Sequence, residues 1–260
     1  MKQLQDKVCI VTGAGRGIGR ATAIAYGREG AKVVVASRTR ATVDEVAKII
    51  RDEGGTALGV TVDVGHKDQV FAMVDRTVQE FGTVDVIVNN AQGFGTEAKP
   101  QASTVYVAIE DTNDDELYYT FKTGCMGTLW GMQAVFPHMK EKGGRIINFA
   151  SGAGMIGNPG NTSYNATKEA IRAISKTAAN EWGKYQIIVS IVNPALRTDA
   201  FEAWEKARPE YVKTVRESIP LKRLGDPLED GGPTMVFLAS DGNRFMTGMT
   251  YHLVGGRYMP

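Results

Sequence analysis

Short apolar runs alternate along this chain with longer segments whose apolar positions recur at helical spacing. The runs are rich in Val and Ile, and they lie at residues 8–11, 33–36, 58–62, 84–88, 145–149, 187–192 and 249–253. Continuous apolar runs, rather than strict alternation, are typical of strands that are buried on both faces of a parallel sheet. The pattern therefore predicts seven strands.

The segments between these strands carry helical patterns. They lie at residues 17–29, 42–52, 67–81, 113–141, 163–182 and 226–239. Strands that alternate with helices predict an α/β fold, a doubly wound (Rossmann) arrangement with a seven-stranded parallel sheet and helices on both faces. Internal repeats and linkers are absent from the sequence, so we expect a single NAD(P)-binding domain over residues 1–260.

Two long segments interrupt this regular alternation. Residues 92–112 follow the fourth strand, and residues 195–220 follow the sixth and carry Phe201, Trp204 and Tyr211. Both begin at the carboxyl end of a strand, which is where doubly wound folds bind ligands. We expect residues 195–220 to form a substrate lid, with Phe201 and Trp204 facing either the substrate or the core.

Composition excludes several classes of function. The formal net charge is +1, so nothing steers the chain to nucleic acid or to a membrane, and we expect neither as a partner. The polar N-terminus and the lack of an apolar stretch of ~20 residues predict a cytoplasmic protein. Two cysteines far apart, Cys9 and Cys125, are expected to be free thiols. Three scattered histidines form no metal-binding motif, so no metal is expected.

The first strand ends in a glycine-rich turn, Thr12-Gly13-Ala14-Gly15-Arg16-Gly17-Ile18-Gly19. Glycines at 13, 17 and 19 let the chain turn sharply and bring backbone N–H groups close to a pyrophosphate at a helix N-terminus. The alternative is an ordinary glycine-rich turn. The position of the turn after the first strand of a βαβ unit favours dinucleotide binding, through Gly13, Gly15, Arg16, Gly17, Ile18 and Gly19.

The end of the second strand indicates which dinucleotide is bound. NAD sites usually place an Asp or Glu here, but this chain reads Ala36-Ser37-Arg38-Thr39-Arg40. Ser37 and Arg38, with Arg16 opposite, are suited to a ribose 2′-phosphate. We therefore expect NADP(H) to be preferred and NAD(H) to be possible. Further contacts are expected from the ends of the third and fourth strands, at Asp63, Val64, Asn90 and Ala91.

A candidate catalytic group follows the fifth strand. Ser151 follows that strand, and Tyr164 and Lys168 stand four residues apart on one face of the next helix. A nearby ammonium favours the phenolate form, so we expect Lys168 to lower the pKa of Tyr164 and make it an acid and base near neutral pH. A Tyr-Lys pair alone is weak evidence for a catalytic site. Its position after a strand that is followed by a serine makes that evidence stronger.

These motifs together resemble the short-chain dehydrogenase/reductase family, from about Lys7 to Gly256. The glycine turn, Asn89-Asn90-Ala91-Gln92, and the Ser151, Tyr164 and Lys168 set carry the resemblance. It implies that nicotinamide exchanges a hydride with the carbonyl carbon while Tyr164 exchanges a proton with the oxygen. It also implies that Lys168 holds the nicotinamide ribose, that Pro194 and Thr198 lie near the nicotinamide, and that the protein is a homotetramer.

The sequence departs from the family pattern at three places. Gly124 stands where many members have an Asn that supports a proton-relay water, and Gln92 replaces a glycine. Pro194-Ala195 replaces a Pro-Gly turn, with one residue fewer before Thr198. These features, with Asn148-Phe149-Ala150-Ser151-Gly152 and Glu181-Trp182-Gly183-Lys184, are similar to bacterial hydroxysteroid dehydrogenases of the 12α type.

The sequence therefore predicts an NADP-dependent oxidoreductase that interconverts a secondary alcohol and a ketone on a hydrophobic, alicyclic or steroid-like substrate. A 3-oxoacyl thioester reductase would use the same three residues and is the alternative within enzymes. A dinucleotide-binding sensor or scaffold with little catalysis is the alternative of another class, and Gly124 is the feature that encourages it.

Overall fold

Seven parallel strands form the central sheet of the computed structural model, which describes residues 2–198, 201–202, 205 and 209–257. Their spatial order is β3-β2-β1-β4-β7-β8-β9. The bounds are β1 Val8–Thr12, β2 Lys32–Ser37, β3 Thr56–Thr61, β4 Val86–Asn89, β7 Gly144–Phe149, β8 Ile187–Pro194 and β9 Thr250–Leu253. The predicted doubly wound, seven-stranded parallel sheet is confirmed.

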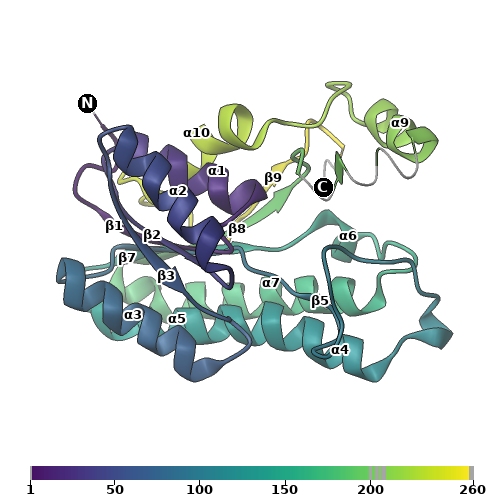
Figure 1. Cartoon of the computed structure of the whole chain (residues 1–260), viewed down its shortest axis with the longest axis horizontal. Helices are drawn as coiled ribbons and strands as arrows, with labels where there is room; N and C mark the ends of the chain where they lie inside the picture. The colour runs from purple at the N-terminus through teal and green to yellow at the C-terminus, as the bar shows by residue number, and fades with distance from the viewer. Residues whose placement is uncertain (1, 199–200, 203–204, 206–208, 258–260) are drawn as a thin grey trace.

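Helices cover both faces of this sheet (Figure 1). One face carries α1 Gly17–Arg28, α2 Arg40–Asp52 and α10 Gly232–Ala239, and the other carries α3 Lys67–Phe81, α5 Gly127–Met139 and α7 Thr162–Trp182. Successive residues of a strand point into the hydrophobic cores on opposite faces of the sheet. In β2, Val33 and Val35 pack under α1 and α2, and Val34 packs under α3 and α5. This burial on both faces explains why the strands read as continuous apolar runs.

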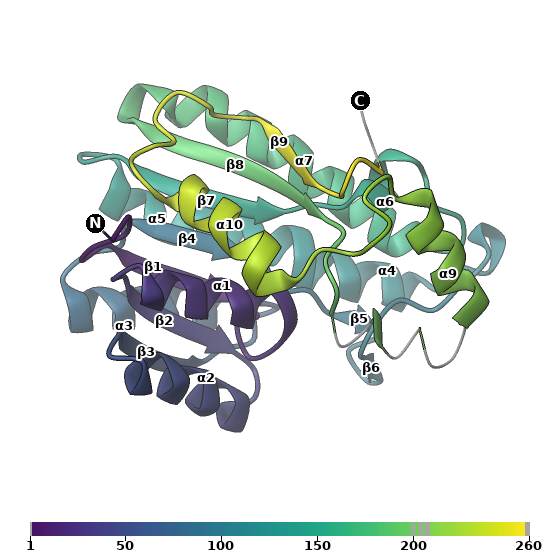
Figure 2. The same ribbon diagram turned by 90° about the horizontal axis from the view of Figure 1, so that it is seen from above.

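The strand order reverses between β2 and β4, which both flank β1. Loops that leave β1 and β4 must diverge at this point, and a crevice at the carboxyl ends of the strands results. The hairpin of β5 Phe94–Gly95 and β6 Pro100–Gln101, with α9 Pro209–Ser218, lies beyond the arrowheads of the sheet (Figure 2). The two long interruptions of the sequence pattern therefore do meet the ligand-binding edge.

Two segments are more regular or more broken than the sequence predicts. The loop 92–112 contains the β5–β6 hairpin and a short 3₁₀ helix, Ile109–Asp111. The predicted long helix 113–141 is divided into α4 Asp114–Phe121 and α5 by a π-helical turn, Lys122–Met126. The helix predicted over 226–239 also begins with a π-helical turn, Pro227–Gly231.

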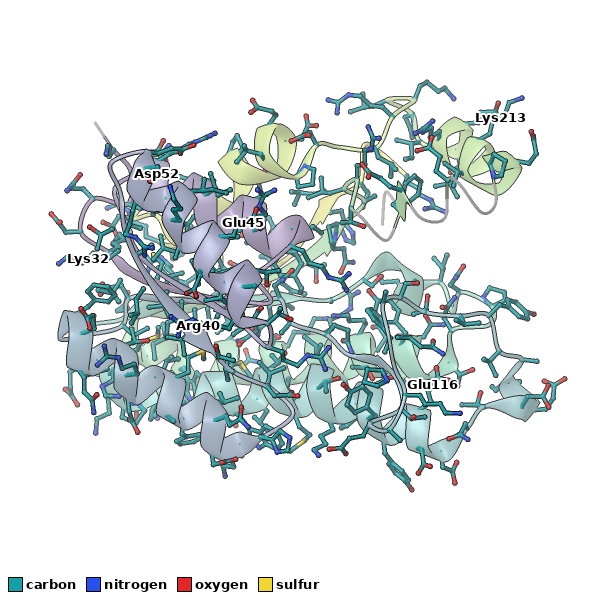
Figure 3. All side chains as sticks on the ribbon, viewed as in Figure 1. Lys32, Arg40, Glu45, Asp52, Glu116 and Lys213 are labelled. Atoms are coloured by element: carbon teal, nitrogen blue, oxygen red, sulfur yellow. The ribbon has the colours of Figure 1, made fainter. Side chains whose placement is uncertain are left out.

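Charged side chains stand on the outside of the helical layers, for example Arg40, Glu45 and Asp52 along α2 and Lys213 on α9 (Figure 3). Along α2 the charges pair at helical spacing, Arg40 with Asp44 and Lys48 with Asp52. Within the described residues, no helix is both long enough and apolar enough to span a bilayer.

Candidate active site

The glycine turn between β1 and α1 leaves a helix N-terminus open to an anion. Gly13 and Gly17 adopt φ of 66° and 54°, which side chains rarely allow. A Cβ on Gly19 would lie 2.4 Å from the Gly13 carbonyl oxygen, so close packing also requires glycine there. Among the described residues, no side chain caps α1 and its first turn holds no acid. This open cradle fits a pyrophosphate.

The end of β4 fixes the shape of this turn. The Asn90 side-chain amide donates hydrogen bonds to the carbonyls of Thr12 (3.0 Å) and Gly13 (3.3 Å). The buried Thr12 hydroxyl donates to the Val88 carbonyl and accepts from the backbone N–H groups of Asn90 and Ala91. Asn90 and Ala91 therefore lie against the turn, where the sequence predicts cofactor contacts.

Two exposed arginines, Arg16 and Arg38, follow the carboxyl ends of β1 and β2. Arg38 follows β2, is exposed, and donates a hydrogen bond to the Tyr119 hydroxyl (2.9 Å), with Asp63 at 3.9 Å. Arg16 is exposed and donates to the carbonyl of Ala102 in the loop after β4 (3.2 Å). The hydroxyl of Ser37 lies against Gly15, because a Cβ on that glycine would be 2.9 Å from it.

The remaining predicted cofactor residues lie beside the glycine turn or near the carboxyl ends of strands. The methyl group of Thr198 would be 3.8 Å from a Cβ on Gly17, so Thr198 lies beside the glycine turn. Ile18 packs on the core beneath α1, and the carbonyl of Val64 lies close to the start of α5. Pro194 ends β8. Trp204 is outside the described residues, and the Phe201 N–H donates to the Thr198 hydroxyl (3.4 Å).

Ser151, Tyr164 and Lys168 come together at the carboxyl end of β7. Ser151 caps the short helix α6 Gly152–Met155 by accepting a hydrogen bond from Ala153, and its hydroxyl is near enough to Tyr164 to lower the pKa of the phenol. The Lys168 ammonium donates to the Phe149 carbonyl (2.9 Å) and lies 5.5 Å from the centre of the Tyr164 ring. A phenol that lies near both a serine hydroxyl and a lysine amino group can exchange a proton with a substrate oxygen.

Burial, rather than mutual attraction, sets the protonation of this pair. Burial lowers the pKa of Lys168 to about 7, partly opposed by Cys125. Burial raises the pKa of Tyr164, and the hydrogen bond from Ser151 partly lowers it. The prediction that the ammonium lowers the pKa of the phenol is therefore wrong for the chain without cofactor, because desolvation disfavours the charged form of both groups.

Two residues that sequence reasoning gave no role touch this site. The ring of Phe94, in the β5–β6 hairpin, lies 5.7 Å from the Tyr164 ring. Gln92, noted only as a departure from a motif, packs its side-chain amide against Gly124. Gln92 and Gly124 were both visible as departures in the sequence, but only the fold shows that they are in contact.

Comparison with known proteins decides the family. A model of the short chain dehydrogenase family matches residues 7–209. The chain belongs to that family.

Relatives match this short-chain dehydrogenase along nearly its whole length. A 12α-hydroxysteroid dehydrogenase from a Clostridium species is 38% identical over 96% of both chains. A 3-oxoacyl-[acyl-carrier-protein] reductase from Thermotoga maritima is 34% identical over 98% of both. The solved structure of a 7α-hydroxysteroid dehydrogenase with NADH and 7-oxo glycochenodeoxycholic acid has a TM-score of 0.89 and 28% identity, covering 98% of this chain and 95% of that one. This short-chain dehydrogenase is an NAD(P)-dependent oxidoreductase of alcohols or ketones.

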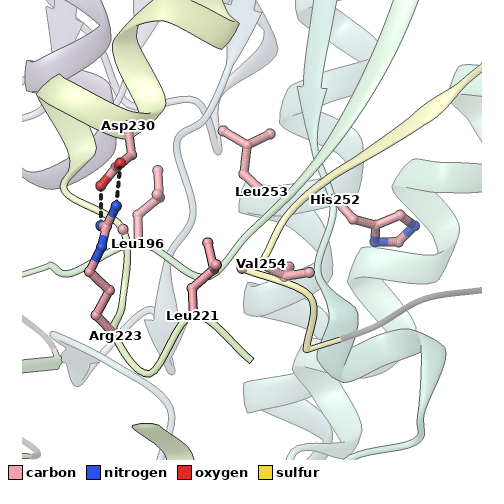
Figure 4. Close-up of a pocket in the computed structure, with 9 residues that line it drawn as sticks. Leu196, Leu221, Arg223, Asp230, His252, Leu253 and Val254 are labelled. Atoms are coloured by element: carbon pink, nitrogen blue, oxygen red, sulfur yellow. Dashed lines mark hydrogen bonds and ion pairs between the residues drawn. The ribbon is translucent and has the colours of Figure 1, made fainter. Parts of the chain in front are cut away.

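A small pocket of the dehydrogenase lies at the ends of β8 and β9, and none of Ser151, Tyr164 and Lys168 lines it (Figure 4). Its volume is about 150 Å³, and its walls include Leu196, Leu221 and Val254. Its charged lining residues, Arg223 and Asp230, are paired through two hydrogen bonds of 2.5 and 2.8 Å. Apart from this ion pair and the imidazole of His252, the side chains that line the pocket are apolar.

Within the described ranges, no cluster of three or more His, Cys, Asp or Glu side chains is arranged to hold a metal. Cys9 and Cys125 are free and buried, and burial raises the pKa of the Cys125 thiol to about 11. Neither thiol is a nucleophile at neutral pH, because the thiolate is the reactive form.

Proposed function

We propose that this enzyme is an NADP-preferring dehydrogenase that interconverts a secondary alcohol and a ketone on a hydrophobic, alicyclic or steroid-like substrate. When bound, the nicotinamide supplies or accepts the hydride. Ser151 orients the substrate oxygen by a hydrogen bond, and Tyr164 gives or takes the proton at its hydroxyl. Lys168, anchored on the Phe149 carbonyl, places its amino group beside the phenol, and the charged form of that group favours the phenolate.

The observation that carries the cofactor preference is the exposed Arg38 at the end of β2, where an NAD site has an acid. An arginine fork pairs with a phosphate in two hydrogen bonds, whereas a carboxylate would repel it. We include in the proposed 2′-phosphate site the Ser37 hydroxyl, which lies against Gly15, and Arg16, which lies in the glycine turn. Asp63 and Val64 are proposed near the adenine, and Pro194 and Thr198 near the nicotinamide.

The apolar surroundings of Tyr164 support a hydrophobic substrate. Phe94 lies against the Tyr164 ring, and the segment that carries it meets the loop after α6 through a bridge between Val107 and Asn161. Large apolar side chains exposed on these two segments are Val105, Tyr106, Ile109, Met155 and Ile156. Exposed apolar groups gathered near a catalytic group mark a binding site for an apolar ligand.

We also propose that residues 195–220 form a lid over this site, and that residues 1–260 fold as one domain. The lid would include α9 and the residues beside Thr198, which lies next to the glycine turn. Closure over the crevice would exclude water from the reacting atoms.

The test is a screen for cofactor oxidation or reduction at the absorbance band of the reduced nicotinamide. NADP and NAD are each paired with bile acids, other cyclic alcohols and ketones, and an acetoacetyl thioester. Turnover with NADP and a hydroxysteroid is expected. Turnover confined to the thioester would replace the substrate proposal with a 3-oxoacyl thioester reductase, the activity named for the Thermotoga relative. Equal use of NAD would contradict the role of Arg38.

A further inference from the structure

The hydroxyl of Tyr119 contacts Arg38, the arginine that we propose binds the 2′-phosphate. Nη1 of Arg38 donates a hydrogen bond of 2.9 Å to this hydroxyl, across 81 residues of the chain. Tyr119 lies in α4 and is only 7% exposed, whereas the Arg38 side chain is 47% exposed. A buried phenol therefore holds one end of an arginine that otherwise extends into solvent.

The position of the Tyr119 ring is fixed by the loop after β4. A Cβ on Gly93 would lie 3.0 Å from Cε1 and 3.1 Å from Cζ of the ring, so the backbone of Gly93 lies against the ring. The Tyr119 carbonyl accepts a hydrogen bond from the Thr123 hydroxyl (2.9 Å), and that hydroxyl accepts one from the Gly93 N–H (3.1 Å). The Tyr119 hydroxyl is thus a preorganised acceptor for Arg38.

Asp63 is the competing partner of Arg38. Oδ2 of Asp63 lies 3.9 Å from Nη1 of Arg38, which is beyond hydrogen-bond distance, and Oδ1 accepts from the Gly65 N–H (2.8 Å). A guanidinium released from Tyr119 would be free to rotate onto this carboxylate and form a charge-assisted pair. Such a pair would use the donors that a phosphate needs, so the bond to Tyr119 keeps them available.

The edge of the guanidinium that faces away from Tyr119 is open. Within the part of the chain that the structure describes, Nε and Nη2 of Arg38 have no hydrogen-bond partner. These two groups form the edge that binds two oxygens of one phosphate side-on. An arginine that is already held loses less side-chain freedom when the phosphate binds, so the phosphate binds more tightly.

We propose that Tyr119 is a positioning residue for cofactor discrimination, and that its hydroxyl holds the Arg38 guanidinium where it binds the 2′-phosphate of NADP(H). The inference rests on the proposed function, which assigns that phosphate to Arg38. Tyr119 should therefore raise the affinity for the phosphorylated dinucleotide and have little effect on the other, because only the phosphorylated form uses the guanidinium edge. A residue that sets specificity then lies on α4, outside the sequence motifs that bind the cofactor.

Two other roles are compatible with the same hydrogen bond. In the first, Tyr119 holds Arg38 away from the phosphate, and loss of its hydroxyl would strengthen binding of the phosphorylated nucleotide. In the second, the hydroxyl only supports the packing of α4, and its loss would weaken binding of both nucleotides alike. The direction and the selectivity of the effect separate these roles from the proposed one.

Binding of two cofactor fragments tests the inference without a substrate. Isothermal titration calorimetry measures the Kd of adenosine 2′,5′-bisphosphate and of adenosine 5′-monophosphate in the wild type, Tyr119→Phe and Tyr118→Phe. Tyr118 is the matched control, because it is the neighbouring tyrosine of α4, is 67% exposed, and has no hydrogen-bond partner for its hydroxyl in the described ranges. Tyr119→Phe should weaken binding of the bisphosphate by about 3- to 10-fold and keep that of the monophosphate within about 2-fold. Tyr118→Phe should change neither.

A double-mutant cycle tests whether Tyr119 acts through Arg38. In an Arg38→Met background, Tyr119→Phe should change the Kd of the bisphosphate by less than about 2-fold, because the group that it positions is gone. The inference is overturned if the loss persists in that background, if Tyr119→Phe binds the bisphosphate as tightly as the wild type or more tightly, or if both fragments are weakened equally.

The same titrations separate this inference from the proposed function. A wild type that prefers the bisphosphate, together with an unaffected Tyr119→Phe, would reject the inference and leave the NADP preference standing. A wild type that binds both fragments with equal affinity would reject the NADP preference, and the inference with it. Because fragment binding requires no turnover, a wild type that is inactive on every alcohol and ketone tested would reject the substrate proposal alone, and the titrations would still decide the role of Tyr119.

Discussion

At the scale of single residues, burial determines how the proposed catalytic pair, Tyr164 and Lys168, is protonated. The spacing of Tyr164 and Lys168 places both on one helix face, which the sequence predicts. It does not reveal that Lys168 is only 4% exposed, and this burial lowers the pKa of its ammonium to about 7. The pair therefore changes charge near neutral pH through the lysine, while burial holds the phenol protonated.

Tyr164→Phe should lower kcat by about 10²- to 10⁴-fold, because it removes the hydroxyl that we propose exchanges the proton. Cofactor Kd, measured by fluorescence titration, should stay close to the wild-type value. The matched control is Tyr185→Phe, which removes a hydroxyl from a ring that packs on Phe136 away from the site. Turnover of Tyr164→Phe near the wild-type rate would remove this tyrosine from the mechanism.

Arg38→Asp should shift the cofactor preference from NADP toward NAD, because it removes the phosphate partner and installs the acid that NAD sites have. The ratio of kcat/KM with NADP to kcat/KM with NAD measures the shift, and we expect this ratio to fall by about 10-fold or more. Arg40→Asp is the control: Arg40 pairs with Asp44 on the outside of α2. A similar shift in both variants would mean that the overall charge of this surface, and not Arg38 itself, sets the cofactor preference.

At the scale of elements, one glycine explains why the helix predicted over 113–141 is broken. The turn Lys122–Met126 is π-helical, and the Gly127 N–H donates to the carbonyl of Lys122 five residues earlier. At its centre, Gly124 leaves room for the Gln92 amide and the Thr167 methyl. Helical periodicity predicted the path of the helix but not this widened turn, because the partners that fill the space come from other parts of the chain.

Gly124→Ala should reduce the free energy of unfolding by about 1–3 kcal/mol, because its Cβ would overlap two fixed side chains. Gly183→Ala is the control, since nothing lies within 4 Å of a Cβ there and its φ is −55°. Urea unfolding of both variants measures the difference. Equal stability of the two variants would show that the space beside Gly124 can expand without cost.

At the scale of the whole molecule, folding takes the Lys168 charge out of water, so stability depends on pH. The pKa of this lysine is about 7 in the fold and 10.5 as the ordinary value. Between these values the unfolded chain binds a proton that the fold does not. Stability contributed by this group is therefore complete above about pH 10.5 and is lost as the pH falls toward 7.

Lys168→Met should remove this dependence. The difference in free energy of unfolding between wild type and variant, without cofactor, should rise with pH by up to about 1.4 kcal/mol per unit between pH 7 and 10. Urea unfolding at a series of pH values measures it, with Lys176→Met, an exposed lysine of the same helix, as the control. A difference that does not change with pH would contradict the burial of a neutral amine.

Assembly also belongs to this scale. We propose a homotetramer, and the segment from α10 to β9 carries exposed apolar side chains that a second copy would cover, with Phe245 96% and Met249 55% exposed. Phe245→Glu should reduce the mass measured by light scattering after size exclusion, because a charge would enter the interface. Arg244→Glu is the neighbouring control. A monomeric wild type would disprove the tetramer.

The sequence by itself determined the layered fold, because strands that are buried on both faces of a sheet consist of unbroken apolar runs. It also determined the glycine turn and the serine, tyrosine and lysine positions, because local spacing encodes them. The bounds of β3, β4 and β8 shifted by up to two residues, since strand ends depend on their neighbours. Only the tertiary structure decided the charge of Lys168, the contact of Phe94 with Tyr164, and the meeting of Gln92 with Gly124. Desolvation and long-range packing depend on residues that are distant in the chain, and no local pattern records them.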